Sequence, residues 1–131
     1  MFRISIVLIV FILIFHPYLM GEEEVIIAVA SDGETLNATV SHSAARCPYF
    51  LIVDSEGKLL EAVENPYQET RFGAGISVVN FLAEKNVTVV IAGNCGSKMK
   101  NALEAQEIAF FKFEGIVEEA IIEILEKESQ I

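Results

Sequence analysis

Long apolar runs alternate with helical patterns over most of the chain, after a hydrophobic leader. Residues 25–30, 49–54 and 87–92 are nearly continuous apolar runs of strand length, which predicts strands that are buried on both faces. Residues 59–64 follow the second run after a short turn, so these two segments predict a β-hairpin. Residues 107–113 predict a fifth strand.

Apolar residues at helical spacing follow the hairpin and each of the last two strands, and they predict three helices. The expected order is therefore strand, hairpin, helix, strand, helix, strand, helix. Asn86 is the expected C-terminal stop of the first helix, and Ser97 is the expected N-cap of the second. The apolar positions that define the helices are Ile76, Val79, Leu82 and Ala83; Met99, Ala102 and Leu103; and Val117, Ala120, Ile121, Ile124 and Leu125.

Strand direction brings several loops to one edge of the predicted sheet. Hairpin strands are antiparallel, whereas strands joined through a helix are parallel. The loops that contain Asp32, Cys47, Gly73 and Cys95 therefore lie where the first strand ends, and His42 reaches the same edge in the long loop before Cys47. Ligands bind at this edge in open α/β sheets, so we expect these residues to line one continuous cleft.

The most informative turn follows the strand at residues 87–92 and reads Gly93, Asn94, Cys95, Gly96. Its two glycines permit a tight turn, and the helix after it presents unpaired N–H groups that favour anions. This pattern places Cys95 at the carboxyl end of a central strand. The alternative interpretation is a structural turn with a small buried cysteine.

Residues 1–20 form a hydrophobic leader that is separate from the predicted domain at residues 21–131. The leader is apolar from Ile4 to Phe15 except for one serine, which fits a signal-peptide core or a short membrane anchor. Either role predicts a membrane-associated or exported protein. A start of translation at Met20 is the alternative, and it predicts a cytoplasmic product.

Acidic residues outnumber basic ones by 19 to 9, and the formal net charge is −10. Binding to a phosphate backbone needs clustered Lys and Arg, so this composition argues against nucleic acid as a partner. Cys47 and Cys95 can form one disulfide in an exported protein or remain thiols in a cytoplasmic one. The sequence has no Cys-x-x-Cys or His-Glu-x-x-His pattern, so it does not support a self-sufficient zinc site.

Five segments together carry a family resemblance. In chain order they are Ile27-Ala28-Val29-Ala30-Ser31, Arg46-Cys47-Pro48-Tyr49-Phe50-Leu51-Ile52-Val53, Glu64-Asn65-Pro66, Gly73-Ala74-Gly75 and Val89-Val90-Ile91-Ala92-Gly93-Asn94-Cys95-Gly96. With these segments, the chain from about Val25 to Leu125 resembles the dinitrogenase iron-molybdenum cofactor-binding family.

The resemblance implies an α/β domain with three layers, α/β/α, and a ribonuclease-H-like motif. It also implies a mixed five-stranded sheet of order 3-2-1-4-5 in which strand 2 is antiparallel. In function, it implies binding or carrying of a metal–sulfur cluster, or of its precursor, during cofactor assembly.

One segment departs from the family pattern. The family commonly has Ser-x-His-Phe-Gly-Arg before the Pro-Tyr-Phe strand, whereas this chain reads Ser41-His42-Ser43-Ala44-Ala45-Arg46. The histidine comes one position early, and a shift of one residue redirects a side chain unless the backbone compensates. A solvated loop histidine is therefore the alternative to a ligand role for His42.

We expect a binding or carrier module and not an enzyme, with Cys95, Cys47 and His42 as metal ligands of a cluster that contains iron or molybdenum. Arg46 and turn amides are expected to offset the negative charge of the cluster. A protein that donates or accepts the cluster is the expected partner, and the oligomeric state is left open. The full candidate set for cofactor binding is Cys95, Cys47, His42, Arg46, Asp32, Gly73, Gly75, Gly93, Asn94 and Gly96.

Two other functions are alternatives. The first is a membrane-tethered interaction or regulatory domain that has a structural disulfide and no cluster. The second is a metal-dependent nuclease or phosphoryl-transfer enzyme, suggested by the fold analogy alone. The second is disfavoured because Asp32 and Asp54, the only aspartates, lie at opposite ends of neighbouring antiparallel strands and cannot share a metal.

Overall fold

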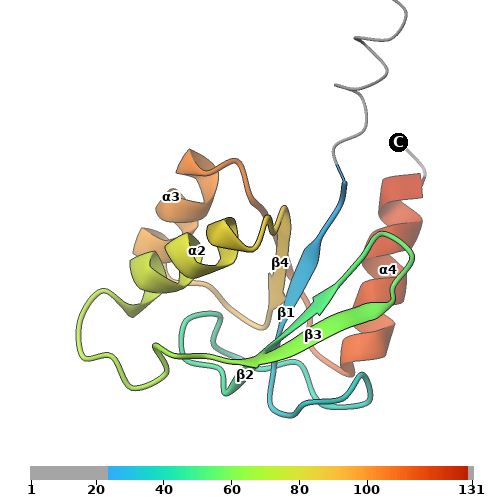
Figure 1. The fold of residues 1–131 in the computed structure, drawn as a ribbon, viewed down its shortest axis with the longest axis horizontal. Coiled ribbons are helices and arrows are strands. Elements are labelled where there is room, and N and C mark those ends of the chain that lie inside the picture. Colours follow the sequence, from blue (N-terminus) through green and yellow to red (C-terminus); the bar gives the residue numbers. More distant parts are fainter. Residues whose placement is uncertain (1–23, 130–131) are drawn as a thin grey trace, which may run out of the picture.

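The computed structural model describes residues 24–129 (Figure 1). The predicted leader at residues 1–20 lies outside this range. Within it, no helix has both the length and the apolar character that crossing a membrane requires. The elements are β1 (Ile27–Ser31), β2 (Tyr49–Val53), β3 (Leu59–Glu64), α2 (Ala74–Glu84), β4 (Val89–Ala92), α3 (Ser97–Ala105), β5 (Ala109–Lys112) and α4 (Val117–Ser129).

The sheet confirms the predicted topology. Its five strands have the order β3-β2-β1-β4-β5. β2 is antiparallel to both of its neighbours, while β1 and β4, and β4 and β5, are parallel. α2 and α3 cover one face of the sheet and α4 covers the other, which gives the three layers (Figure 1). The carboxyl ends of β1 and β4 and the start of β2 therefore lie at one edge.

Alternate residues of the central strands enter two hydrophobic clusters, one on each face of the sheet. Because β1 and β4 contribute to both clusters, all of their residues are buried, as the continuous apolar runs predicted. Strand residues in the cluster under α2 and α3 are Ala28, Ala30, Phe50, Ile52, Val90 and Ala92. Those in the cluster under α4 are Ile27, Val29, Leu51, Val53, Val89 and Ile91.

β1 and β4 both begin two residues later than predicted. Their first ladder pair joins Ile27 to Val89. Before that pair, the N–H of Ile26 donates to the side-chain hydroxyl of Thr88 over 3.1 Å. This side-chain bond takes the place of a ladder bond, so the regular strand starts after it.

α2 and α3 end in the same way, and each ending turns the chain back toward the sheet. Asn86 has a left-handed φ of 63°, and the N–H of Val87 donates to the carbonyl of Leu82 over 3.2 Å. This is a Schellman ending, and it confirms Asn86 as the stop of the first helix. Glu107 has a φ of 58° in the equivalent position after α3, and for that reason β5 begins only at Ala109.

The long loop between β1 and β2 is fixed by main-chain hydrogen bonds. The N–H of Val40 donates to the carbonyl of Gly115 over 2.8 Å, and the N–H of Ser41 donates to that of Ala30 over 2.8 Å. The second half of the loop is thereby held over the carboxyl end of β1. This confirms the loop that the lack of periodicity predicted and fixes its position at the expected ligand edge.

Candidate functional site

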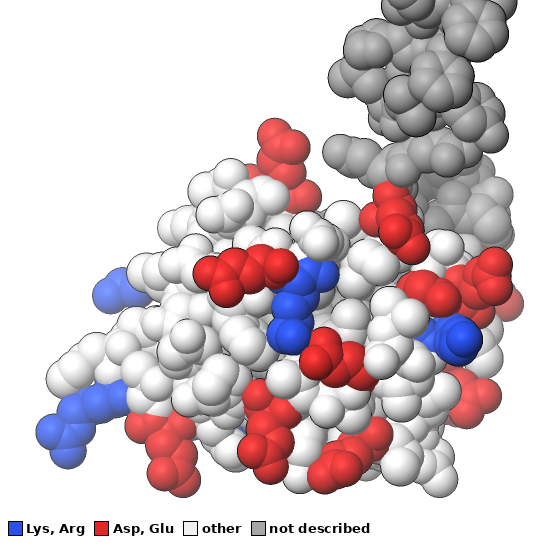
Figure 2. All heavy atoms as spheres, viewed as in Figure 1, with Lys and Arg blue, Asp and Glu red and all other residues white. Residues whose placement is uncertain are grey.

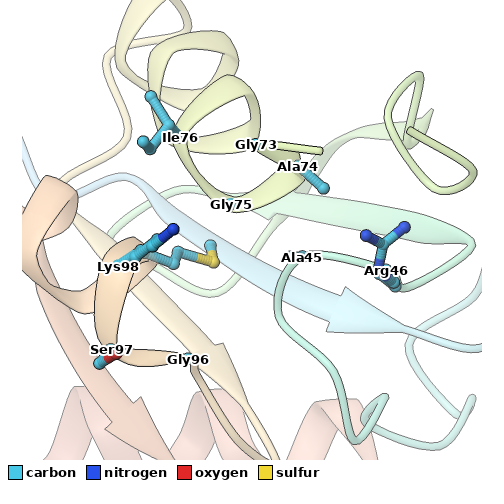
Figure 3. A pocket seen from close by; sticks show the side chains of 10 residues that line it. Ala45, Arg46, Gly73, Ala74, Gly75, Ile76, Gly96, Ser97 and Lys98 are labelled. Carbon is cyan, nitrogen blue, oxygen red and sulfur yellow. The ribbon is translucent and has the colours of Figure 1, made fainter. Parts of the chain in front are cut away.

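A pocket of about 360 Å³ opens at the carboxyl edge, where the first turns of α2 and α3 meet the loop before β2 (Figure 3). Strand direction predicted that Gly73 and the turn after β4 would meet at this edge, and both line the pocket. The complete lining is Ala45, Arg46, Gly73, Ala74, Gly75, Ile76, Gly96, Ser97, Lys98 and Met99.

Both helices begin at the pocket without a capping side chain. Gly73 is the N-cap of α2 and Gly96 is the N-cap of α3. The prediction that Ser97 caps α3 is wrong, because Ser97 is the first residue inside the helix and makes no cap hydrogen bond. The first N–H groups to bond within the helices are those of Ser77 and Lys100.

The earlier N–H groups of both helices therefore face the pocket unpaired. The residues that carry them are Ala74, Gly75 and Ile76 in α2, and Ser97, Lys98 and Met99 in α3. All of them line the pocket, and their N–H groups have no acceptor among the described residues. Two helix N-termini that lack a capping side chain and share one pocket make a site suited to an anion.

Charged side chains add to the positive electrostatic potential of the two helix N-termini. Arg46 and Lys98 lie on opposite sides of the pocket (Figure 3), and no carboxylate lines it. The first turn of α3 carries Lys98 and Lys100, where the helix dipole favours carboxylates. α4 shows the usual arrangement, with Glu118 and Glu119 in its first turn. Carboxylates are spread widely over the face shown in Figure 2, whereas none lines the pocket.

Arg46 is held in place by the segment that leads into α2. Its Nη1 donates to the carbonyl of Thr70 over 2.7 Å and to that of Gln68 over 3.2 Å. Nη2 and Nε have no acceptor within residues 24–129. The guanidinium is thus oriented by one nitrogen and retains donors for a ligand.

Asn65 supports the same turn, a role that sequence reasoning missed. Its buried Nδ2 donates to the carbonyls of Ala45 and Cys47, each over 2.9 Å. Its Oδ1 accepts from the N–H of Tyr67 over 2.9 Å. The sequence feature that could have indicated this role is an asparagine directly before a proline. Lys98 was also not predicted as a site residue, and the sequence feature that could have indicated it is a lysine in the first turn of a predicted helix.

The two cysteines have different environments, and both are free thiols in the structure. Cys47 is fully buried in the cluster under α2 and α3, and burial raises the pKa of its thiol to about 12. The predicted cleft lined by Asp32, Cys47, Gly73 and Cys95 is therefore wrong for Cys47, whose side chain faces the core. Gly73 alone among the four lines the pocket.

Cys95 is half-buried and lies directly before the N-cap residue of α3, with its sulfur 3.6 Å from the carbonyl oxygen of Gly96. Burial raises the pKa of the Cys95 thiol, and the positive charge of Lys100 opposes this rise. Cys95 is thus the more accessible thiol at this edge, adjacent to residues that line the pocket.

His42 lies against the turn after β4. A Cβ atom on Gly93 would come within 2.8 Å of the His42 Cα, so glycine is required for this close approach. The N–H of Gly93 donates to the carbonyl of Ser41 over 2.9 Å, and the N–H of Ala44 donates to that of Asn94 over 3.0 Å. These bonds fix the backbone at His42 while its side chain remains exposed.

Within the described part of the chain, no group of three or more His, Cys, Asp or Glu side chains is placed to hold a metal ion. Cys95, Cys47 and His42 do not form such a group. Asp32 is exposed at the end of β1 and does not line the pocket. The ligand roles of these residues remain predictions.

Comparisons with known proteins agree on one family. The sequence pattern described as "Dinitrogenase iron-molybdenum cofactor" matches residues 24–127. The apo form of the orange protein from Desulfovibrio gigas is 31% identical over 79% of this chain and 88% of its own, with a TM-score of 0.73. No curated protein matches the chain.

Two further solved structures are similar. A candidate NifB protein from Thermotoga, which belongs to the DUF35 family, is 38% identical over 78% of this chain and 88% of its own, with a TM-score of 0.68. A candidate dinitrogenase from Methanocaldococcus jannaschii is 20% identical over 80% of this chain and 91% of its own, with a TM-score of 0.58. The last similarity is one of fold.

The two thiols are expected to differ in reactivity. Because the thiolate is the reactive form, Cys95 should react slowly with iodoacetamide near neutral pH and faster as the pH rises, since its pKa lies above the ordinary thiol value. Cys47 should react only after unfolding, because it is fully buried. Peptide mass spectrometry after alkylation, with and without denaturant, measures this difference. Equal labelling of both cysteines in the native protein would contradict the described core.

Proposed function

Because the chain belongs to the dinitrogenase iron-molybdenum cofactor family, we propose that it binds and carries an anionic metal–sulfur cluster, or the precursor of one, in the pocket between α2 and α3. The observation that carries the proposal is that two helix N-termini without a capping side chain share one pocket with Arg46 and Lys98. An anionic cargo accepts hydrogen bonds from these N–H groups and is attracted by both cations.

Such a cargo does not need a complete set of protein ligands. Metal–sulfur anions bring their own sulfide ligands, which accept hydrogen bonds from backbone amides and cationic side chains. This fits a site rich in donors in which the described residues offer no three-ligand metal group. We propose that charge and N–H donors contribute to the binding energy together with a protein ligand, and that neither is sufficient alone.

Cys95 adds a soft ligand at the side of the pocket. Thiolates bind iron, copper and molybdenum–sulfur species, and metal coordination displaces the thiol proton even where burial raises the pKa. His42 adds an exposed imidazole beside the same turn. Cys47 stabilises the core in this proposal, because its side chain is fully enclosed.

Carrying is favoured over catalysis by the lining of the pocket. The residues that line it provide no carboxylate and no imidazole, which are the usual groups for general acid–base chemistry. The pocket is open at the surface, so cargo can pass to a second protein without unfolding of this one. The partner that we propose is therefore a protein that donates or accepts the cluster.

Removing the cation at the start of α3 should weaken cargo binding. Lys98→Gln is expected to raise the Kd for tetrathiomolybdate, a simple molybdenum–sulfur anion, by roughly tenfold at low salt, because one charge-assisted contact is lost. Equilibrium dialysis under anaerobic conditions measures the Kd.

Lys58→Gln is the matched control for this variant. It makes the same change of charge on an exposed residue in the turn between β2 and β3, at the opposite edge of the sheet. The control should bind as the wild type does. An equal loss in both variants would show a general effect of net charge and would contradict a local site.

Replacing the soft ligand tests the metal-binding part of the proposal. Cys95→Ser keeps the size of the side chain and is expected to abolish uptake of an iron–sulfur or molybdenum–sulfur cluster, with little change in the melting temperature. His42→Asn should have a smaller effect, because its loop position is shifted from the family pattern. Anaerobic reconstitution followed by visible absorption measures uptake.

Two outcomes would contradict this prediction. Normal uptake by Cys95→Ser would remove Cys95 as a ligand and leave binding to the N–H groups and cations alone. No uptake by the wild type would favour the interaction-domain alternative.

A further inference from the structure

The first turns of α2 and α3 touch at a point where only glycine fits. A Cβ atom on Gly75 would lie 2.7 Å from the Cβ of Met99 and 3.4 Å from its Cα. These atoms of Met99 are fixed to the backbone, so no change of rotamer relieves the overlap. Ordinary contact begins at 3.4 Å, so the helices would have to separate by about 0.7 Å at this point.

The other glycines of the pocket have different roles. Gly73 has a φ of 71°, and a Cβ there would meet nothing within 4 Å, so its backbone conformation and not its packing favours glycine. Gly96 has a φ of −66° and is equally open, so other residues fit there. Close approach of the two helices therefore depends on Gly75, although alanine is the more favourable residue in a helix.

We propose that Gly75 is a positioning residue: its contact with Met99 sets the spacing of the two helix N-termini so that one tetrahedral anionic group reaches the N–H donors of both. Gly75 and Met99 both line the pocket, so their contact forms part of its wall. The group is a compact MX₄ dianion, in which a metal M carries four oxide or sulfide ligands X, and it is either free or the end of a larger cluster. This inference rests on the proposed function, because it assumes an anionic cargo.

The spacing makes the pocket selective for size. A small anion reaches both sets of N–H groups only while the helices stay close, whereas a larger anion spans a wider gap. Oxide is smaller than sulfide, so molybdate and tetrathiomolybdate have the same shape and charge but different sizes. The ratio of their Kd values therefore reports the spacing, independently of the overall strength of binding.

The test is Gly75→Ala in the full chain. The ratio of the Kd for molybdate to the Kd for tetrathiomolybdate should rise by about tenfold, as expected when the smaller anion loses one hydrogen bond to its charge. Equilibrium dialysis gives the Kd for tetrathiomolybdate, and competition gives that for molybdate. The melting temperature should fall, although alanine without the overlap would raise it.

Val79→Ala is the control for lost stability. Val79 is fully buried in α2, and its truncation lowers the melting temperature without placing an atom between the helix N-termini. Its ratio of Kd values should equal that of the wild type. An equal ratio in Gly75→Ala and wild type, or an equal shift in Val79→Ala, would overturn the inference.

A second pair of variants changes the other partner of the contact, Met99 of α3. This test does not require Gly75→Ala to fold. Met99→Ala and Met99→Gly both remove the long side chain and differ only in the Cβ that faces Gly75. Met99→Gly should lower the ratio relative to Met99→Ala, because the helices are free to approach. An equal ratio in the two variants would contradict a spacing role.

Binding of the two anions by the wild type shows which of the two ideas fails, this inference or the proposed function. Wild-type protein that binds neither anion would refute the proposed function. Wild-type protein that binds tetrathiomolybdate but not molybdate would overturn the inference and leave the proposed function standing.

Discussion

Two helices of this protein start on glycines, have no capping side chain and start at the same pocket. A glycine N-cap in place of Ser, Thr, Asp or Asn costs only a few tenths of a kcal/mol for each helix, and lysines in a first turn are opposed by the helix dipole. α2 and α3 both lack a capping side chain, and α3 also carries Lys98 and Lys100 in its first turn. A bound anion would satisfy the free N–H groups and offset both effects.

The rest of the fold holds these two helix ends together. β1 and β4 are parallel and fully buried, and they fix the edge at which α3 begins. The turn before β2 is braced by Asn65 and carries Arg46 to the rim of the pocket. Gly75 lets the two helices come into contact at the wall. The sheet, the loop before β2 and the contact between the helices thus all position the same N–H groups at the pocket.

The order of the elements and the sheet edge were readable from the sequence, because continuous apolar runs and helical spacing depend on local pattern. Asn86 was correctly identified as a helix stop for the same reason. Cys47 was placed at the right edge but facing the wrong way, since the direction of a side chain just before a strand depends on packing that the sequence does not display. Lys98 was not predicted, because the sequence motifs with chemical meaning pointed to soft ligands, whereas N–H donors and cations line the pocket.

We propose above that the N–H groups of both helix ends bind one anion. Titration of ¹⁵N-labelled protein with tetrathiomolybdate, followed by two-dimensional NMR, shows whether they do. We expect the amide resonances of residues 74–76 and 97–99 to shift together with one Kd, while those of α4 stay in place. Shifts confined to one helix, or a binding site elsewhere on the molecule, would contradict it.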